Sequence, residues 1–227
     1  MSQNLLLLHG ALGSQKQLEP VKQLLSKHFT VWVMDFEGHG GHLSEADFSM
    51  GLFAENVMAF MEKNGIGKAH IFGYSMGGYV ALTLAAKRPG LVQSIVTLGT
   101  KFNWTPEAAA AEVKMLNPEV IEQKVPHFAE KLKTEHHPAD WKRVMLRTAD
   151  MMLDLGKGKG LSDNDFAKIR HKVTIGIGSL DKMVSIAESQ AVADVLPNGA
   201  LQILEGVGHP LEKIDVEVLW RYIVSNI

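Results

Sequence analysis

The stretch Gly73-Tyr74-Ser75-Met76-Gly77-Gly78 contains the pattern G-x-S-x-G and joins two segments of different character. Residues 69–73 form a short apolar run typical of a buried strand, and residues 76–87 have the composition of a buried helix. Between a strand and a helix, this pattern holds its serine in a sharp turn that exposes the hydroxyl. Small neighbours are needed there because side chains would collide with the adjoining backbone. The stretch therefore predicts a nucleophilic Ser75; the alternative is a serine that only caps the helix.

Short apolar runs alternate with longer amphipathic segments on both sides of this stretch, which indicates parallel strands joined by helices. The runs lack regular alternation of apolar and polar residues, as expected for a sheet covered on both faces. We expect strands at residues 4–9, 30–35, 69–73, 94–98, 173–177 and 201–204. We expect helices at residues 15–27, 50–64, 76–87, 186–196 and 212–225. The pattern predicts one α/β domain over residues 1–227.

About seventy residues between the fourth and fifth predicted strands interrupt this rhythm. The segment, residues 101–168, is predicted to be a helical insertion with helices at 106–115, 118–133 and 139–155. A Gly/Lys-rich loop at 156–160 is expected to return the chain to the sheet. The insertion is either a lid over a pocket or a subdomain that covers a sheet edge.

Two further loops supply partners for the serine. His209 lies in Gly206-Val207-Gly208-His209-Pro210, a glycine-flanked loop after the sixth predicted strand. Asp181 follows the fifth strand, which gives the chain order Ser, Asp, His. Asp163 and Asp165 are rivals, but they precede that strand and are expected at the opposite end of the sheet. The sequence favours His209 as the base and Asp181 as the residue that orients it.

An oxyanion hole is predicted from two backbone amides. The first strand ends in His9-Gly10-Ala11-Leu12-Gly13-Ser14, a loop of small residues that can approach the serine. The second donor is expected to be the residue after the nucleophile. We therefore assign the Ala11 and Met76 amides to the hole, and His9 to a structural role.

These segments, together with Asp35-Phe36-Glu37-Gly38-His39-Gly40 after the second strand, resemble the signatures of the α/β-hydrolase superfamily and follow its order. The resemblance implies that Ser75 attacks, His209 accepts its proton and Asp181 holds the imidazole. The superfamily usually begins with a two-stranded antiparallel hairpin, but here the His-Gly strand begins within five residues of Met1. We therefore expect a reduced α/β-hydrolase fold with six parallel strands, helices on both faces and a helical lid insertion.

Within the superfamily, the opening loop and the serine turn are similar to those of the menaquinone-pathway synthase MenH, a lyase. That enzyme has arginine directly after its Ser-Met-Gly-Gly, to hold an acidic substrate. Here Tyr79 occupies the position, which weakens the lyase interpretation unless Arg143 or Arg147 supplies the charge.

The expected reaction is hydrolysis of a carboxylic ester or related acyl compound through an acyl-Ser75 intermediate, without a cofactor. Alternatives on the same scaffold are carbon–carbon bond hydrolysis, MenH-like elimination and cofactor-free perhydrolysis. A protein that binds a small ligand without catalysis is the alternative from another class. Trp104, Tyr79 and Met145 are the candidate pocket residues.

The amino-acid composition limits the kinds of molecule that the protein is expected to bind. A net charge of −2 with mixed signs gives no footprint for nucleic acid or an anionic membrane, so a small-molecule substrate is expected, and nothing indicates an oligomeric state. The absence of cysteine and of a signal-like segment favours a cytoplasmic protein. His136-His137 is expected in a solvated loop rather than at a metal. The glycine-lysine run at 156–160 lacks the Ser/Thr ending of a phosphate-binding loop.

Overall fold

The computed structural model describes residues 3–227 and contains a six-stranded sheet in which every neighbouring pair is parallel. The strand order is β2-β1-β3-β4-β5-β6. The strands are β1 (Asn4–Leu8), β2 (Thr30–Val33), β3 (Ala69–Tyr74), β4 (Val92–Leu98), β5 (Lys172–Gly178) and β6 (Gly199–Leu204). The predicted reduced parallel sheet is confirmed.

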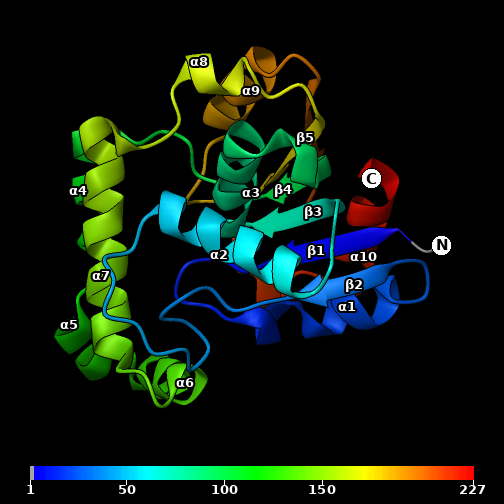
Figure 1. Ribbon diagram of the computed structural model, residues 1–227. Coiled ribbons are helices and arrows are strands. Elements are labelled where there is room, and N and C mark those ends of the chain that lie inside the picture. Colours follow the sequence, from blue (N-terminus) through cyan, green and yellow to red (C-terminus); the bar gives the residue numbers. More distant parts are fainter. Residues whose placement is uncertain (1–2) are drawn as a thin grey trace.

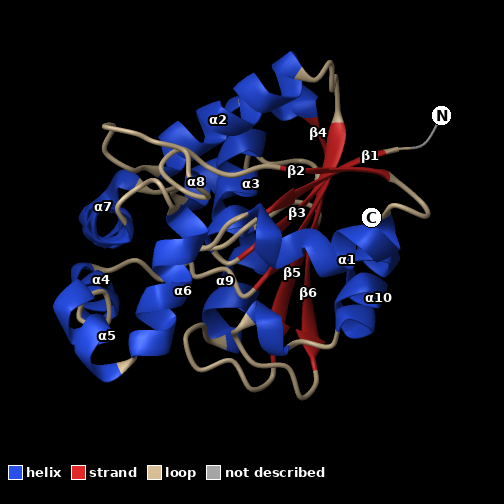
Figure 2. Cartoon of the chain, turned by 90° about the horizontal axis from the view of Figure 1, so that it is seen from below, coloured by secondary structure: helices blue, strands red, loops and turns tan. Residues whose placement is uncertain are grey.

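Helices cover both faces of the sheet (Figure 2). Leu5 and Leu7 of β1 pack in the core formed with α1 (Glu19–Leu25) and α10 (Val216–Asn226). Leu6 and Leu8 point to the other core, which includes α2 (Met50–Lys63), α3 (Met76–Lys87) and α9 (Ile186–Val195). Side chains alternate along a strand, so a run of leucines is the pattern of a strand buried on both sides.

Most of the insertion between β4 and β5 forms a group of helices beyond the strand ends rather than on a face of the sheet (Figure 1). This group consists of α4 (Pro106–Val113), α5 (Pro118–Lys124), α6 (Pro126–His136) and α7 (Trp141–Asp154). The short α8 (Asp163–Phe166) lies apart from the group, beside α3 and α9, and its Phe166 packs in the core on that face of the sheet. The first three helices of the group each begin with proline, whose fixed φ and missing N–H suit the first position of a helix.

The structure corrects several predicted boundaries. The helix predicted over 118–133 is two helices, because Val125 precedes Pro126 and has extended φ of −136°. The predicted return loop instead begins as a π-helical turn over Leu155–Lys159, although Gly158 departs from helical geometry with φ of 85°. Short 3₁₀ turns shorten or flank some of the predicted helices. They lie at Gln15–Leu18, Pro89–Leu91 and Leu211–Lys213.

The strand order places a crevice beside the predicted nucleophile. From β1 the chain crosses to β2 on one side, and it returns to β3 on the other side of β1. The loops that follow β1 and β3 therefore diverge at the carboxyl edge of the sheet, where open α/β sheets bind ligands. Ala11 follows β1 and Ser75 follows β3.

Gly77 tests how tightly this edge is packed. A Cβ atom at Gly77 would lie 2.4 Å from the Leu8 carbonyl oxygen, whereas one at Gly90 would meet nothing within 4 Å. We expect Gly77→Ala to lower the free energy of unfolding by about 2 kcal/mol or more through overpacking. Gly90→Ala should change it by less than about 1 kcal/mol. Urea titration of both variants checks this, and equal stabilities would contradict the packing described here.

Candidate active site

Ser75 lies in a strained turn between β3 and α3. Its φ of 50° and ψ of −116° are unusual for a residue with a side chain, and such a conformation costs about 1–3 kcal/mol. Surrounding hydrogen bonds hold it: the Ser75 N–H donates to the Leu98 carbonyl at 2.8 Å. The Ser75 carbonyl accepts from the Thr100 hydroxyl at 2.9 Å and from the Gly78 N–H at 3.1 Å. Neighbouring β4 therefore fixes the backbone of the serine.

His209 and Asp181, which the sequence placed on separate loops, form a hydrogen-bonded pair. His209 Nδ1 lies 2.7 Å from Asp181 Oδ2, and the two side chains are 10% and 1% exposed. The other Asp181 oxygen accepts from the N–H groups of Met183 at 2.8 Å and Val184 at 3.0 Å. Because both carboxylate oxygens are occupied, the aspartate fixes the imidazole and directs Nε2 away from itself.

The protonation of Asp181 follows from these contacts. Burial opposes its ionisation, but the hydrogen bond and positive charge of His209, with the two backbone N–H groups, outweigh burial and lower the pKa of Asp181. The carboxylate is therefore ionised at neutral pH and can accept a hydrogen bond from the Nδ1–H group of His209. Gly99, with φ of 63°, leaves space for the pair, since a Cβ there would lie 3.2 Å from the His209 ring.

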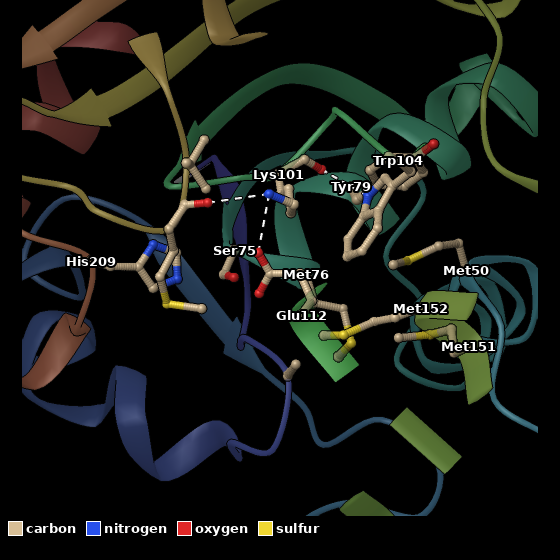
Figure 3. A pocket seen from close by; sticks show the side chains of 13 residues that line it. Met50, Ser75, Met76, Tyr79, Lys101, Trp104, Glu112, Met151, Met152 and His209 are labelled. Carbon is tan, nitrogen blue, oxygen red and sulfur yellow. Dashed lines mark hydrogen bonds and ion pairs between the residues drawn. The ribbon is translucent and has the colours of Figure 1, made fainter. Parts of the chain in front are cut away.

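Ser75 and His209 both line two adjoining hollows, an inner chamber and an outer cleft. Figure 3 shows the side chains of the inner chamber. The inner chamber has a volume of about 50 Å³ and the outer cleft one of about 290 Å³. Five methionines line the inner chamber, namely Met50, Met76, Met151, Met152 and Met183. The outer cleft extends between the opening loop and the insertion, along Leu12, Gly13, Leu116, Ile121, Phe128 and Leu132. The site is therefore mostly apolar, with its reactive groups at the base.

Two of the predicted pocket residues line the inner chamber and one does not. Tyr79 and Trp104 contribute to its wall (Figure 3). The Tyr79 hydroxyl accepts from the Leu161 N–H at 2.7 Å. Met145 was predicted wrongly: it is fully buried inside the insertion against Leu132 and Trp141. Met145 and Met152 lie on the same face of α7, about two turns apart, so helical spacing alone did not show which turn of the helix reaches the chamber.

The two amides assigned to the oxyanion hole come from residues that line the inner chamber. Met76 is the first residue of α3, where a backbone N–H has no acceptor within its helix. Ala11 lies in a tight turn closed by the Gly13 N–H, which donates to the Gly10 carbonyl at 3.2 Å. In this turn Leu12 has φ of 58°. Both residues share the wall of this chamber with Ser75.

The chamber also contains a cation that the sequence analysis missed. Lys101 and Glu112 both line it and form an ion pair with an N–O distance of 3.2 Å. Arg143 and Arg147, the candidates for binding an acidic substrate, instead contact the loop after β2: Arg143 pairs with Glu45, and Arg147 donates to the Ser44 carbonyl. The charge expected of a MenH-like site is therefore not supplied by these arginines.

Three buried histidines connect the insertion to the loops below it. The ring of His39 lies 5.3 Å from that of His9 and 5.6 Å from that of His136, between centroids. His136 was wrongly expected in a solvated loop: it is the last residue of α6 and fully buried. Its Nδ1 accepts from the Gly40 N–H at 3.2 Å, so its Nε2 carries the proton and donates to the Leu12 carbonyl at 3.1 Å. α6 is thereby attached to the loop that contains Ala11.

A family model described as "alpha/beta hydrolase fold" matches residues 3–140, which is more than half of the chain. The chain belongs to the alpha/beta hydrolase family. A protein of Haemophilus influenzae, provisionally named as an esterase/lipase, is 26% identical over 98% of this chain and 83% of its own length. A Caulobacter vibrioides protein, provisionally named carbamate hydrolase RutD, is 25% identical over 97% of this hydrolase and 88% of its own length. The crystal structure of NosK from Streptomyces actuosus shares the fold, with a TM-score of 0.83, 20% identity and coverage of 99% and 97%.

Neither a cluster of potential metal ligands nor a membrane-spanning helix is found in residues 3–227 of this hydrolase. Within that range, no group of three or more His, Asp or Glu side chains is arranged to hold a metal ion. None of the helices described there is long and apolar enough to cross a membrane.

The buried histidines predict a specific dependence of stability on pH. Burial lowers the pKa of His9 from 6.5 to about 4, and burial lowers the pKa of His39 and of His136. Between about pH 6.5 and 4 the unfolded chain therefore binds more protons than the folded one, so stability falls as pH falls. For His9 alone, the free energy of unfolding should drop by about 2 kcal/mol between pH 8 and pH 5.

Urea titrations across this range measure that slope, and His39→Phe provides the comparison. Phenylalanine suits the site because His39 already stacks on Phe48 with ring centroids 5.2 Å apart. In His39→Phe, the free energy of unfolding should fall less steeply as the pH is lowered. His127→Gln, at an exposed position on α6, should keep the pH dependence of the natural chain. An unchanged slope in His39→Phe would contradict the assignment.

Proposed function

We propose that this alpha/beta hydrolase cleaves small carboxylic esters or related acyl compounds through an acyl-Ser75 intermediate. One observation carries the proposal: the strained Ser75 and His209, whose ring is hydrogen-bonded to Asp181, line the same inner chamber. A nucleophile, a base and a group that orients the base are the three components of nucleophilic acyl transfer. The esterase/lipase name of the Haemophilus influenzae relative supports the same chemistry.

In the first half of the proposed reaction, Ser75 Oγ attacks the carbonyl carbon while its proton passes to His209 Nε2. The Nδ1 proton remains hydrogen-bonded to Asp181, whose ionised carboxylate stabilises the imidazolium. Negative charge develops on the carbonyl oxygen, where the N–H groups of Ala11 and Met76 stabilise it. The carbon–oxygen bond then breaks, and the leaving alkoxide takes the proton from Nε2. The alcohol departs and the acyl group stays on Ser75.

In the second half, water enters from the outer cleft, which is open to solvent and reaches both Ser75 and His209. His209 removes a proton from the water, and the resulting hydroxide attacks the acyl carbon. Cleavage of the acyl–Oγ bond returns the proton to Ser75 and releases the carboxylic acid. No cofactor enters either half, and every proton is exchanged between Ser75, His209, water and the leaving alcohol.

The size of the inner chamber suggests a short acyl group. A cavity needs about 10–15 Å³ to hold one water, so a chamber of about 50 Å³ holds the equivalent of a few waters. The methionine side chains are flexible and can adapt to an apolar chain. The leaving group would occupy the larger outer cleft.

Carbamate cleavage is a second candidate, because the Caulobacter vibrioides relative carries that name. A carbamate carbonyl can undergo the same attack by Ser75, so the two candidates share a mechanism and differ in substrate. The MenH-like elimination has less support, since Tyr79 replaces the arginine of that enzyme and Lys101 is paired with Glu112.

Substitution of the proposed nucleophile and acid tests the mechanism. We expect Ser75→Ala to lower kcat for 4-nitrophenyl acetate by about 10⁴-fold or more and to abolish labelling by a fluorophosphonate. Asp181→Asn should lower kcat about 10³- to 10⁴-fold while retaining slow labelling, because the imidazole loses its orienting charge. Ser26→Ala and Asp194→Asn, on exposed parts of the helical layers, serve as matched controls.

If the natural chain is not labelled and does not turn over esters, the nucleophile assignment is wrong and a ligand receptor becomes the better interpretation. If it is labelled but Ser75→Ala is labelled equally, another residue is the nucleophile.

Acyl-chain length provides a separate prediction. Esters of acetate and butyrate should have kcat/KM values at least about tenfold above those of octanoate and laurate, because longer chains exceed the inner chamber. A series of 4-nitrophenyl esters at equal concentration measures this. A steady rise in kcat/KM through laurate would contradict the short-acyl assignment.

A further inference from the structure

The Lys101–Glu112 pair is the main charged feature of an otherwise apolar inner chamber. Lys101 follows β4 and Glu112 lies on α4 of the insertion, and their side chains are 18% and 15% exposed. Figure 3 shows both head groups directed into the space between Ser75, Trp104 and the methionines. The pair therefore faces the space that a bound acyl group would occupy.

The hydrogen-bonding capacity of the pair is only partly used. The Lys101 ammonium has three protons. It lies 3.2 Å from Glu112 Oε1 and donates to the Met183 carbonyl at 3.3 Å. The same nitrogen lies 5.8 Å from the centre of the Trp104 ring, a cation–π contact. Within residues 3–227, the third proton and Glu112 Oε2 have no hydrogen-bonding partner assigned to them. The chamber thus offers a bound molecule one donor and one acceptor side by side.

The charge balance of the pair limits which group can use these positions. The two charges cancel, so an anionic group would meet repulsion from Glu112 and a cationic group repulsion from Lys101. A purely apolar group would displace water from the remaining donor and acceptor without replacing its hydrogen bonds, which weakens binding. A neutral group that both donates and accepts, such as a hydroxyl or a primary amide, satisfies both positions.

Stability alone does not explain why a partly buried ion pair occupies this wall. Removing two charges from water carries a desolvation cost, and apolar residues of similar volume often stabilise a protein equally well. Apart from Ser75 and His209, the rest of the chamber wall consists of the five methionines, Ala11, Tyr79, Trp104 and Val184. A role in selecting substrate accounts for keeping two charged groups in this wall.

We propose that Lys101 and Glu112 form a specificity element that selects acyl groups carrying a neutral hydrogen-bonding substituent, a hydroxyl or an amide, near the carbonyl. Lys101 donates to the oxygen of the substituent, and Glu112 accepts its O–H or N–H proton. The inference rests on the proposed function, because it places the acyl portion of the substrate in the inner chamber.

Pairs of esters that differ only by hydroxyl and methyl test this directly. The pairs are 4-nitrophenyl 3-hydroxybutanoate with 3-methylbutanoate, and 2-hydroxypropanoate with 2-methylpropanoate. In at least one pair, kcat/KM should favour the hydroxyl ester by about tenfold or more after correction for spontaneous hydrolysis. Lys101→Met/Glu112→Leu should reverse the preference, lowering kcat/KM for the hydroxyl ester and raising it for the methyl ester. Lys22→Met/Glu19→Leu, which removes an exposed ion pair on α1, is the matched control.

A wild-type preference for the methyl ester in both pairs, or an equal loss for both esters in the double variant, would overturn the proposal. The second result would mean that the pair only attaches α4 to the sheet. If the proposed function itself is wrong, the result is different: Ser75 is not labelled and no ester is turned over.

Binding to Ser75→Ala keeps the two questions separate, because it needs no catalysis. Isothermal titration with methyl 3-hydroxybutanoate and methyl 3-methylbutanoate should show tighter binding of the hydroxyl ester. Combining Ser75→Ala with the apolar double substitution should remove that difference. Equal binding of the two esters to Ser75→Ala would overturn the proposal even if the enzyme is active.

Discussion

The turn at Ser75 depends on the close approach of β1, β3 and the start of α3. At Gly77 the helix comes so near to β1 that a methyl group would overlap the Leu8 carbonyl. Gly73 has the same constraint, since a Cβ there would lie 2.4 Å from backbone atoms of Gly77 and Gly78. This packing forces the chain through positive φ at Ser75, a conformation that only an over-determined backbone maintains. The exposed hydroxyl is a consequence of strand and helix packing.

The same edge of the sheet brings the remaining groups together. Parallel strands end at one edge, so the loops after β1, β3, β4, β5 and β6 all meet around the serine. Gly99 leaves space for the His209–Asp181 pair, and the Tyr74 hydroxyl donates to the His209 carbonyl at 2.9 Å. Residues separated by more than a hundred positions in sequence therefore share one site without any long-range covalent link.

The insertion covers the cavity, and two of its polar contacts with the rest of the chain reach the loops around Ser75. Near one end, His136 joins α6 to the Leu12 carbonyl in the opening loop. Near the other, Glu112 joins α4 to Lys101, which also binds the Met183 carbonyl beside Asp181. Both contacts reach loops that carry proposed catalytic groups, so the position of the insertion and the geometry of the site are physically connected.

Much of this arrangement was predictable because short stretches of sequence indicate it without knowledge of the tertiary packing. Apolar runs identified the strands, and the glycines around Ser75 identified a turn that packs against other backbone. Near His209, Gly206 marked a turn with positive φ. Met145, His136 and the Lys101–Glu112 pair were missed or misplaced because their environment depends on how the insertion packs. Met145 and Met152 share one face of α7, so the sequence does not reveal which turn of that face meets the chamber. A histidine at a helix end likewise does not reveal a partner 124 positions away.

The central claim is that Ser75 carries the acyl group during turnover. The direct measurement is peptide mass spectrometry after rapid acid quenching of the enzyme during its first turnovers of 4-nitrophenyl acetate. We expect an acetyl group on Ser75 in the peptide that spans β3 and α3. Ester turnover in the same samples with no adduct on Ser75 would contradict this assignment.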